Sequence, residues 1–566
     1  MKYRHSIFFA ALSAAALYGL SSSARADEYL RADAYNDNVT SGNYLDLWAY
    51  EDYDYLVDGN YLLKRSGLEV TTSQINSDGS TEVVVAEGNH SVGSSGERGD
   101  ILGGKRGQSV TSTNLTINGG YNIERIIGGN YGLGYVEGDR NIVINDGSAN
   151  YIYGGDWYVG QRADSYKHPT LEKYIEGFYS EETYGVKSST DVWTPKKSDG
   201  NINITVNGGV IGQIRGGHNC ATGVIDPKVD IGYSLDEDGN VTALRPYSVG
   251  GDVNIVLTGG TVGTGSGDAI RGAGGSGCSV DGNVNITVKG SAVVNGNIYA
   301  GARNVYAQVG GSCIKIEGGV VNGNVYGGGS WDTYSTRTLG DTEIHLTGGT
   351  INGSVYAAGD RDIVEGSTHV YFSGTGTALS EGSIVSGGGI NGAEVQGTRY
   401  LHIGEPDVVT ECTLTIADFD EVIIASGSTA NLTNLTSPLA RSGYVLDNVT
   451  LLTSSNSADN VITLNLNGIR TAKLTLAVQL TEGETELSDY TVALLGDGWA
   501  TEDLPTELVF FNSLGEEIAA SNIQLTSSTL SGESSFTISA SVPEPASSAL
   551  AVWGLSLLAM RRRRKH

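Results

Sequence analysis

The stretch Asn283–Val288, NVNITV, alternates strictly between polar and apolar side chains. Alternation with a period of two gives a β-strand one apolar face and one polar face. A single strand of this kind cannot bury its apolar face by itself, so it needs partner strands. The sequence therefore predicts that this segment is one member of a larger sheet.

The same strand recurs along the middle of the chain. Each copy contains two apolar residues that are two positions apart, and a glycine usually follows two positions later, as at Gly290 and Gly318. Such glycines suit the corners of a coiled chain, where a positive φ or a close backbone approach is needed. The apolar pairs are Leu115/Ile117, Ile142/Ile144, Ile204/Val206, Ile255/Leu257, Ile286/Val288, Ile314/Ile316, Ile344/Leu346 and Val370/Phe372.

A second element follows each of these strands, in which an apolar residue stands two positions before a pair of small residues. If equivalent positions stack at ~4.8 Å, each row becomes a continuous apolar ladder and the backbone pairs with the coils above and below. We therefore predict an all-β fold, a parallel β-helix or β-solenoid of about eight coils with about 26–31 residues per coil. A β-sandwich of hairpins also has alternating strands, but it does not predict positional identity every ~30 residues. The apolar residues of the second element are Ile126, Ile152, Ile214, Ile270, Ile298, Val325, Val355 and Ile384.

The repeats define the expected domain organisation. We place the solenoid at residues 101–399, between an acidic, tyrosine-rich segment at 27–100 and a segment at 400–541 that keeps alternating strands without the glycines. An Asp78-Gly79 hairpin signal in the first flank predicts a cap on the first coil, because an open solenoid end exposes unpaired strand edges. The second flank is interpreted as a β-rich cap or a small sandwich, so both ends are expected to carry β-rich caps.

Two insertions, at about 156–199 and 218–249, leave the repeat after the same glycine pair, so they should emerge at one edge of neighbouring coils. The first insertion is rich in aromatic residues, which can stack on sugar rings when a rigid scaffold presents them. The alternative is that these aromatics form a small core that holds the insertion onto the solenoid. Two outward arginines should be stacked neighbours beside the insertions. The possible ligand face consists of Trp157, Tyr158, Trp193, Arg215 and Arg271.

Cys220 and Cys278 follow equivalent positions of neighbouring coils by similar distances, so we predict that they form a disulfide. No CxxC motif or histidine spacing supports a metal site, and none is predicted. No cofactor is expected either.

Composition restricts the class of protein further. Glycine accounts for 81 of 566 residues, about twice the average usage, while proline accounts for 9. The formal net charge is −29, and the terminal stretches 1–26 and 546–566 carry eight positive charges and no acid, so the body between them carries about −37. A surface of this sign repels nucleic acid, so no nucleic-acid partner is expected.

The N-terminus has the three parts of a secretory signal peptide. Lys2 and Arg4 give a positive start, an apolar stretch follows, and Ala24-Arg25-Ala26 matches an A-x-A cleavage site. We predict that residues 1–26 are removed during export, after Ala26.

The C-terminus carries a second sorting signal at 542–566. Pro543-Glu544-Pro545 precedes the apolar run Ala546–Met560, and Arg561, Arg562, Arg563 and Arg564 follow at once. This order closely resembles the PEP-CTERM sorting signal of Gram-negative, exopolysaccharide-producing bacteria. The resemblance implies that an exosortase of the inner membrane cuts at the Pro-Glu-Pro site and releases or transfers the body to the envelope. A helix of fifteen residues spans roughly 22 Å of the ~30 Å hydrocarbon core, so it would be a short transmembrane helix. This helix would anchor the chain in the inner membrane transiently, before processing.

These observations give two hypotheses about function. The leading one is an exported structural or adhesive protein of the cell surface, envelope or extracellular matrix, and the glycine-rich phrase Gly318–Gly328 resembles repeats of large bacterial adhesins. The alternative is a β-helix protein that binds or cleaves a polysaccharide through the aromatic insertion. The outward positions of the second element supply no carboxylate pair, and the chain has no G-x-S-x-G motif. No catalytic residue is therefore assigned, and a polysaccharide lyase or hydrolase is the less favoured interpretation.

Overall fold

The computed structural model describes residues 70–541 with internal gaps, the longest at 160–199 and 221–232, together with β1 (Asp54–Tyr55) and β2 (Leu63–Lys64). Every regular element in these ranges is a β-strand. In the same ranges no helix has the length and apolar character needed to cross a membrane. The expected signals at 1–26 and 542–566 lie outside the described residues.

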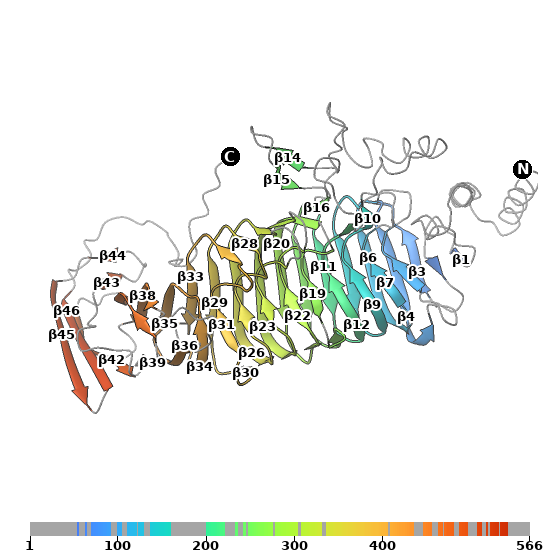
Figure 1. The fold of residues 1–566 in the computed structure, drawn as a ribbon. Coiled ribbons are helices and arrows are strands. Elements are labelled where there is room, and N and C mark those ends of the chain that lie inside the picture. The colour runs from blue at the N-terminus through green and yellow to red at the C-terminus, as the bar shows by residue number, and fades with distance from the viewer. Residues whose placement is uncertain are drawn as a thin grey trace, which may run out of the picture.

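The longest feature is a parallel ladder, the first ladder, to which each turn of the chain contributes one strand (Figure 1). Neighbouring strands in it are parallel from the first to the last. In chain order its strands are β4 (Thr81–Ser91), β6 (Thr113–Tyr121), β8 (Arg140–Ile144), β11 (Ile202–Val206), β17 (Val253–Leu257), β20 (Cys278–Val288), β23 (Gln308–Val321), β26 (Thr342–Ile351), β29 (Thr368–Phe372), β33 (Arg399–Ile403), β35 (Glu421–Ala425), β38 (Asn448–Ser454), β41 (Leu474–Gln479) and β43 (Glu507–Phe511).

A second parallel ladder runs beside the first and contains the second repeated element. The chain passes from one ladder to the other in every coil, so residues about one coil apart in sequence become neighbours in space. The strands of the second ladder are β5 (Gly99–Leu102), β7 (Ile123–Ile127), β9 (Ser148–Tyr153), β12 (Val210–Arg215), β19 (Asp268–Arg271), β22 (Asn297–Tyr299), β24 (Val325–Tyr326), β27 (Val355–Tyr356), β31 (Ile384–Ser386), β34 (Thr410–Ala417), β36 (Ser428–Asn434), β39 (Thr463–Asn467) and β42 (Glu486–Leu495).

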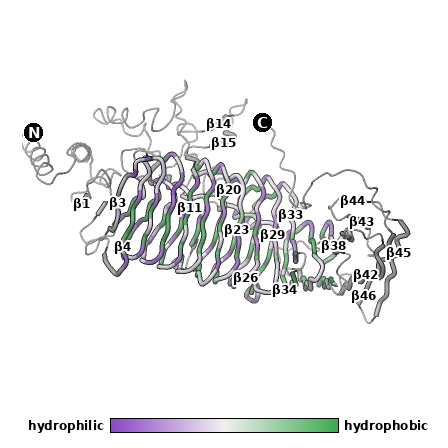
Figure 2. Tube along the Cα trace, turned by 180° about the vertical axis from the view of Figure 1, so that it is seen from behind, coloured by the Kyte–Doolittle hydropathy of each residue, from purple (hydrophilic) through white to green (hydrophobic). Residues whose placement is uncertain are grey.

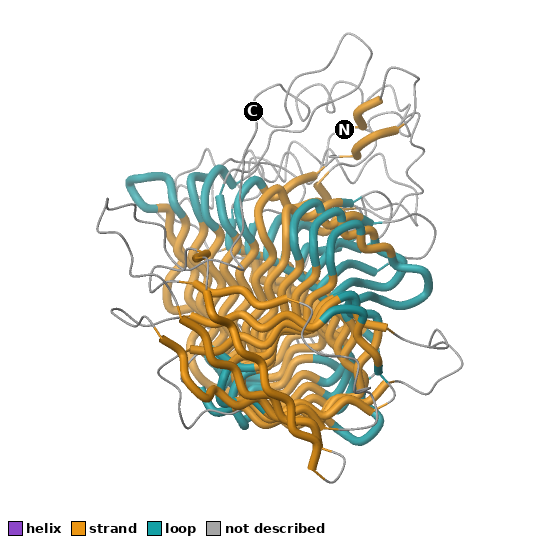
Figure 3. The backbone as a smooth tube through the Cα atoms, turned by 90° about the vertical axis from the view of Figure 1, so that its left-hand side faces the viewer, coloured by secondary structure: helices purple, strands orange, loops and turns teal. Residues whose placement is uncertain are grey.

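Short parallel segments fill the corners between the two ladders, and Figure 3 shows the coils stacked behind one another. One set pairs with the starts of β20 and β23. The other set pairs with the start of β12 and with the ends of β23 and β26. The first set is β16 (Tyr247–Val249), β25 (Arg337–Thr338), β28 (Ile363–Val364) and β32 (Glu394–Val395), and the second is β18 (Thr261–Val262), β21 (Val293–Val294) and β30 (Thr377–Leu379).

The core is the set of apolar rows that the sequence predicted. Ile255 pairs with Ile286, and Ile286 pairs with Ile314, so identical side chains lie above one another inside the coils. All three are completely buried. The alternation of hydrophobic and hydrophilic positions along each coil is visible in Figure 2. The predicted parallel β-solenoid is therefore confirmed, and burial of these rows is the main stabilising contribution.

The eighth register of the second element differs from the prediction by one residue. Val385, not Ile384, pairs with Val355, and Val385 is completely buried. The backbone N–H of Ile384 donates to Ser354 Oγ at 3.1 Å, which places Ile384 in a polar column. The outward neighbour of Tyr356 is consequently Ser386, whereas the prediction required Val385 there.

Antiparallel strands end the parallel stacking on both sides. At the N-terminal end, β3 (Val70–Ile75) forms a hairpin with β4 at the expected Asp78-Gly79 turn, where Gly79 has a φ of 83°. At the other end, β46 (Glu533–Ser541) pairs with both β42 and β45 (Ser521–Leu530), and β44 (Glu517–Ile518) pairs with β43. The coils themselves extend beyond 101–399 in both directions, because β4 and β43 still belong to the first ladder.

One carboxylate is buried at a corner of the solenoid. Asp362 is 1% exposed and accepts hydrogen bonds from the backbone of Gly329 at 2.9 Å and the Thr336 hydroxyl at 3.0 Å. Burial outweighs these hydrogen bonds and raises the pKa of Asp362 to about 6.

The pH dependence of stability should report this burial. Between the unfolded pKa near 3.8 and the folded value near 6, the folded chain holds a proton that the unfolded chain has lost. Protonated Asp362 therefore makes its full contribution to stability below pH ~4, and this contribution is lost as the pH rises to ~6. The free energy of unfolding falls by about 3 kcal/mol over this range. The test is urea unfolding of the wild type and of Asp362→Asn from pH ~4 to ~7. We expect the difference between their free energies of unfolding to change by this amount. A difference that does not vary with pH would contradict it.

Candidate functional site

The two insertions leave the solenoid side by side. The strand β10 (Trp157–Val159) pairs in parallel with β13 (Asn219–Cys220), and Trp157 lies opposite Asn219. Within the second insertion, β14 (Tyr233–Leu235) and β15 (Val241–Leu244) form a hairpin above the coils in Figure 1. The side chains of Trp157 and Tyr158, and all of Trp193, lie outside the described residues, so their contribution to a ligand face stays a prediction.

A buried ion pair lies at the base of these insertions. Arg140 is completely buried, and its guanidinium lies 3.0 Å from Asp156 Oδ2. His218 Nδ1 lies 3.5 Å from the same carboxylate oxygen and accepts a hydrogen bond from the Asp156 backbone at 2.9 Å. Asp156 and His218 stand at the start of the two insertions, so this group fixes the point at which both chain segments depart.

Arg215 and Arg271 are aligned neighbours in the second ladder, as predicted. Arg215 lies over the rings of Tyr151 and Tyr153, at 5.4 and 5.1 Å from their centroids. It also donates to Gln213 Oε1 at 2.8 Å and to Asn219 Oδ1 at 3.1 Å. Contacts within the chain therefore occupy the guanidinium of Arg215.

The second arginine is paired with a half-buried acid. Arg271 Nε lies 2.9 Å from Asp268 Oδ2, and Arg303 approaches the same oxygen at 3.7 Å. Burial raises the pKa of Asp268, although the nearby arginines oppose this effect. Asp268 thus pairs with two of the three arginines of this face.

A tyrosine stack continues this face along the second ladder. The rings of Tyr299 and Tyr326 are parallel with centroids 4.3 Å apart, and Tyr356 follows at 5.1 Å from Tyr326. Tyr299 and Tyr326 are 6% and 2% exposed, and burial raises the pKa of both hydroxyls. Since these ring faces cover one another, they are not open platforms for a sugar.

The predicted Cys220–Cys278 disulfide is wrong, because Cys278 is a free, buried thiol. Its sulfur accepts a hydrogen bond from the backbone N–H of His218 at 3.2 Å, and burial raises its pKa to about 12. In the preceding coil the residue aligned with Cys278 is Tyr247. Cys220 belongs to β13, before the second insertion, so counting from the shared isoleucines did not align the two cysteines.

The outer face of the first ladder begins with a column of asparagines. From Asn141 onward, each side-chain amide donates to the side-chain carbonyl oxygen of the asparagine in the preceding coil, at 2.9–3.0 Å. Such a column satisfies the polar side chains of one coil with those of the next and so fixes the register. The residues of this column are Asn114, Asn141, Asn203, Asn254 and Asn285.

Beyond Asn285 the asparagines are replaced by residues with ionisable side chains. The following positions on the outer face hold rings that stack between coils, with centroids 4.3 Å apart for His345 and Tyr371 and for Tyr371 and His402. Burial lowers the pKa of His402 to about 3, so this imidazole is neutral. The continued column is Cys313, Glu343, His369 and Tyr400, and the column beside it is Lys315, His345, Tyr371 and His402.

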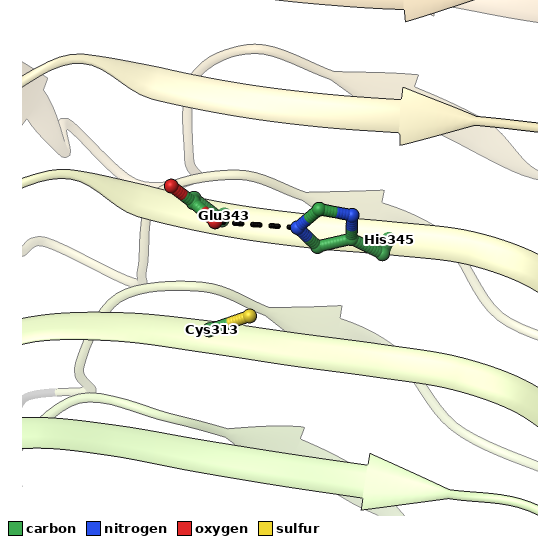
Figure 4. Close-up of side chains that lie close together, drawn as sticks. All are labelled: Cys313, Glu343 and His345. Carbon is green, nitrogen blue, oxygen red and sulfur yellow. Dashed lines mark hydrogen bonds and ion pairs between the residues drawn. The ribbon is translucent and has the colours of Figure 1, made fainter. Parts of the chain in front are cut away.

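Cys313, Glu343 and His345 form a compact cluster on this outer face (Figure 4). One potential ligand atom from each residue lies within 4.8 Å of the other two. His345 Nε2 lies 3.2 Å from Glu343 Oε2, and this hydrogen bond holds the pKa of Glu343 below its usual value. Burial raises the pKa of the Cys313 thiol to about 11. This cluster was not predicted from the sequence.

The fold defines the class of the protein as a parallel β-solenoid with antiparallel ends. Comparisons of the chain with protein-family models, curated proteins and solved structures found no match.

Proposed function

We propose that this chain is an exported structural protein of the cell envelope or extracellular matrix, in which the solenoid acts as a stiff, acidic rod that presents its insertions. One observation carries the proposal. The polar side chains on the outer face of the first ladder bond to one another from coil to coil, as in the column from Asn114 to Asn285. Groups that are paired in this way are suited to rigidity rather than to binding a small molecule.

The physics of stacked coils supports a load-bearing or presenting role. Each coil bonds only to its neighbours, so length can be added without changing local stability. Within the described ladders, nearly every strand is hydrogen-bonded on both sides, and a strand paired in this way is a poor substrate for a protease. The acidic body, at about −37, favours solubility and repulsion between neighbouring rods.

Export and sorting complete the proposal. It assigns release of residues 1–26 to a signal peptidase and cleavage near Pro543-Glu544-Pro545 to an exosortase, with the C-terminal apolar run in the inner membrane until processing. This part of the proposal is supported by the sequences of both termini and by the strongly acidic body between them.

The test is to produce the full chain in a Gram-negative host that carries an exosortase. We expect intact cells to display the body to an antibody, and mass spectrometry to find the C-terminal tail removed. In the variant Pro543→Ala/Pro545→Ala the unprocessed chain should remain in the inner membrane. Accumulation of the wild-type body in the cytoplasm would contradict the proposal.

Carbohydrate binding is the second candidate, and one observation favours it. The pairing of β10 with β13 places Trp157 opposite Asn219, whose side chain contacts Arg215. Two residues of the expected ligand face, Trp157 and Arg215, are therefore linked to the same position of β13. Binding would depend on the aromatic insertion, because the arginine and tyrosine side chains of the coils already contact one another. A glycan array probed with the full chain decides this point, and a purely structural rod gives no selective signal.

A further inference from the structure

The outer face of the first ladder brings a thiol, a carboxylate and an imidazole together on two neighbouring coils. Cys313 of β23 pairs directly with Glu343 of β26, and His345 stands two residues further along β26. Residues two apart on a strand point to the same side, so all three side chains share one face (Figure 4). Two rigid, hydrogen-bonded strands thus fix the spacing of the three groups.

We propose that Cys313, Glu343 and His345 bind a zinc ion through one sulfur, one oxygen and one nitrogen. Zn²⁺ takes these three donor types in four-coordinate sites, whereas Mg²⁺ and Ca²⁺ prefer oxygen alone. Bond lengths of 2.0–2.3 Å place the donor atoms of such a site roughly 3.3–3.7 Å apart. The three ligand atoms lie within 4.8 Å of one another, so small side-chain rotations would bring them into position.

The surrounding residues hold the imidazole in place. The ring of His345 stacks on Tyr371 of the next coil, with centroids 4.3 Å apart and planes 8° from parallel. Neighbours that orient a ligand in this way contribute to metal affinity because they reduce the entropy lost on binding. His345 and Glu343 remain 26% and 43% exposed in their side chains, so an ion can reach the cluster from solvent.

The adjacent coils set the limits of the site. The preceding coil offers Asn285 and Thr287 at the aligned positions. In the following coil His369 faces Glu343, but its Nδ1 lies 3.1 Å from His402 Nε2 in a separate hydrogen bond. The cluster therefore supplies three protein ligands and leaves the fourth position to water or to a donor from another molecule. Zinc binding requires the thiolate, so the proton of Cys313 passes to solvent as the ion enters.

Cobalt substitution on the reduced full chain tests the proposal directly. A thiolate ligand gives Co²⁺ an intense near-ultraviolet charge-transfer band, so the wild type should show this band and Cys313→Ser should lack it. The matched control is Cys412→Ser, which removes a different free thiol in β34 and should retain the band. Thermal melts monitored by circular dichroism establish that each variant is folded.

Zinc competition with a chromogenic chelator measures the other two ligands. We expect Glu343→Gln and His345→Ala each to weaken zinc binding about tenfold or more, since even the loss of an outer neighbour of a metal site costs 10–100-fold. The proposal is overturned if the wild type gives no charge-transfer band, or if folded Cys313→Ser binds cobalt with the same band. Because these readouts do not depend on export or glycan binding, they are independent of the proposed function.

Discussion

Gly216→Ala is expected to lower the free energy of unfolding by about 3 kcal/mol or more, because the added methyl group has no space. A Cβ atom on Gly216 would lie 2.0 Å from the carbonyl oxygen of Gly272 and 2.6 Å from Val253 Cγ1. The first of these is backbone of the next coil and cannot rotate away. The two coils would have to separate where the Gly216 N–H donates to the Arg271 carbonyl at 2.8 Å.

Gly388→Ala is the matched control for this experiment. The three heavy atoms nearest to a Cβ atom there all belong to the side chain of Asp418, at 3.4 Å or more, which is ordinary contact. Urea midpoints and melting temperatures of the two variants should therefore differ clearly, with Gly388→Ala close to the wild type. Equal stability of the two variants would show that the coils do not approach each other as closely as the structure requires.

Arg140→Met should cost about 3–5 kcal/mol, because it leaves the carboxylate of Asp156 buried without its cation. The two side chains are 0% and 7% exposed and lie 3.0 Å apart, so water cannot replace the guanidinium. Arg140 also donates to the Val136 carbonyl at 3.2 Å, and that interaction is lost as well. Urea unfolding should show this decrease in the free energy of unfolding. Because the pair lies where both insertions depart, we also expect faster proteolysis at the insertions.

The exposed pair of Arg337 and Glu365 provides the comparison. Its atoms lie 2.6 Å apart, but the side chains are 41% and 32% exposed, so Arg337→Met should cost less than about 1 kcal/mol. In the double variant Arg140→Met/Asp156→Asn we expect part of the stability to return, because the buried charge is removed. If Arg140→Met is no more damaging than Arg337→Met, the buried pair does not have the role assigned to it.

Much of the fold could be predicted because a solenoid repeats its pattern in sequence. Apolar residues such as Ile255 and Ile286 had to stack, since each strand alone leaves its apolar face in water. The prediction failed where the repeat is irregular, as at Ile384. Val385 takes the core position instead, and Ile384 lies one residue away, beside Ser354. The later coils after β33 were not recognised as solenoid because they lack the glycine phrase, although their alternating strands were visible.

The site was harder to predict, for a physical reason. Cys313 lies thirty residues before Glu343, which is one full coil, so no short motif connects them and the exact register is needed to bring them together. The alignment of Arg215 with Arg271 could be predicted because both follow core isoleucines closely. The disulfide prediction failed because the insertion separates Cys220 from the part of the coil that aligns with Cys278. Aligning the polar residues around the apolar pairs would have revealed both the asparagine column and the cysteine cluster.

The asparagine column has a practical consequence for protein engineering. Consecutive members are separated by 62, 51 and 31 residues along the chain, yet the amide-to-carbonyl distance is 2.9 Å in all three cases. The length of a segment that leaves after the paired glycines therefore does not disturb the spacing of the coils that flank it. Foreign peptides of a length similar to the natural insertions could therefore be grafted at this edge of other coils.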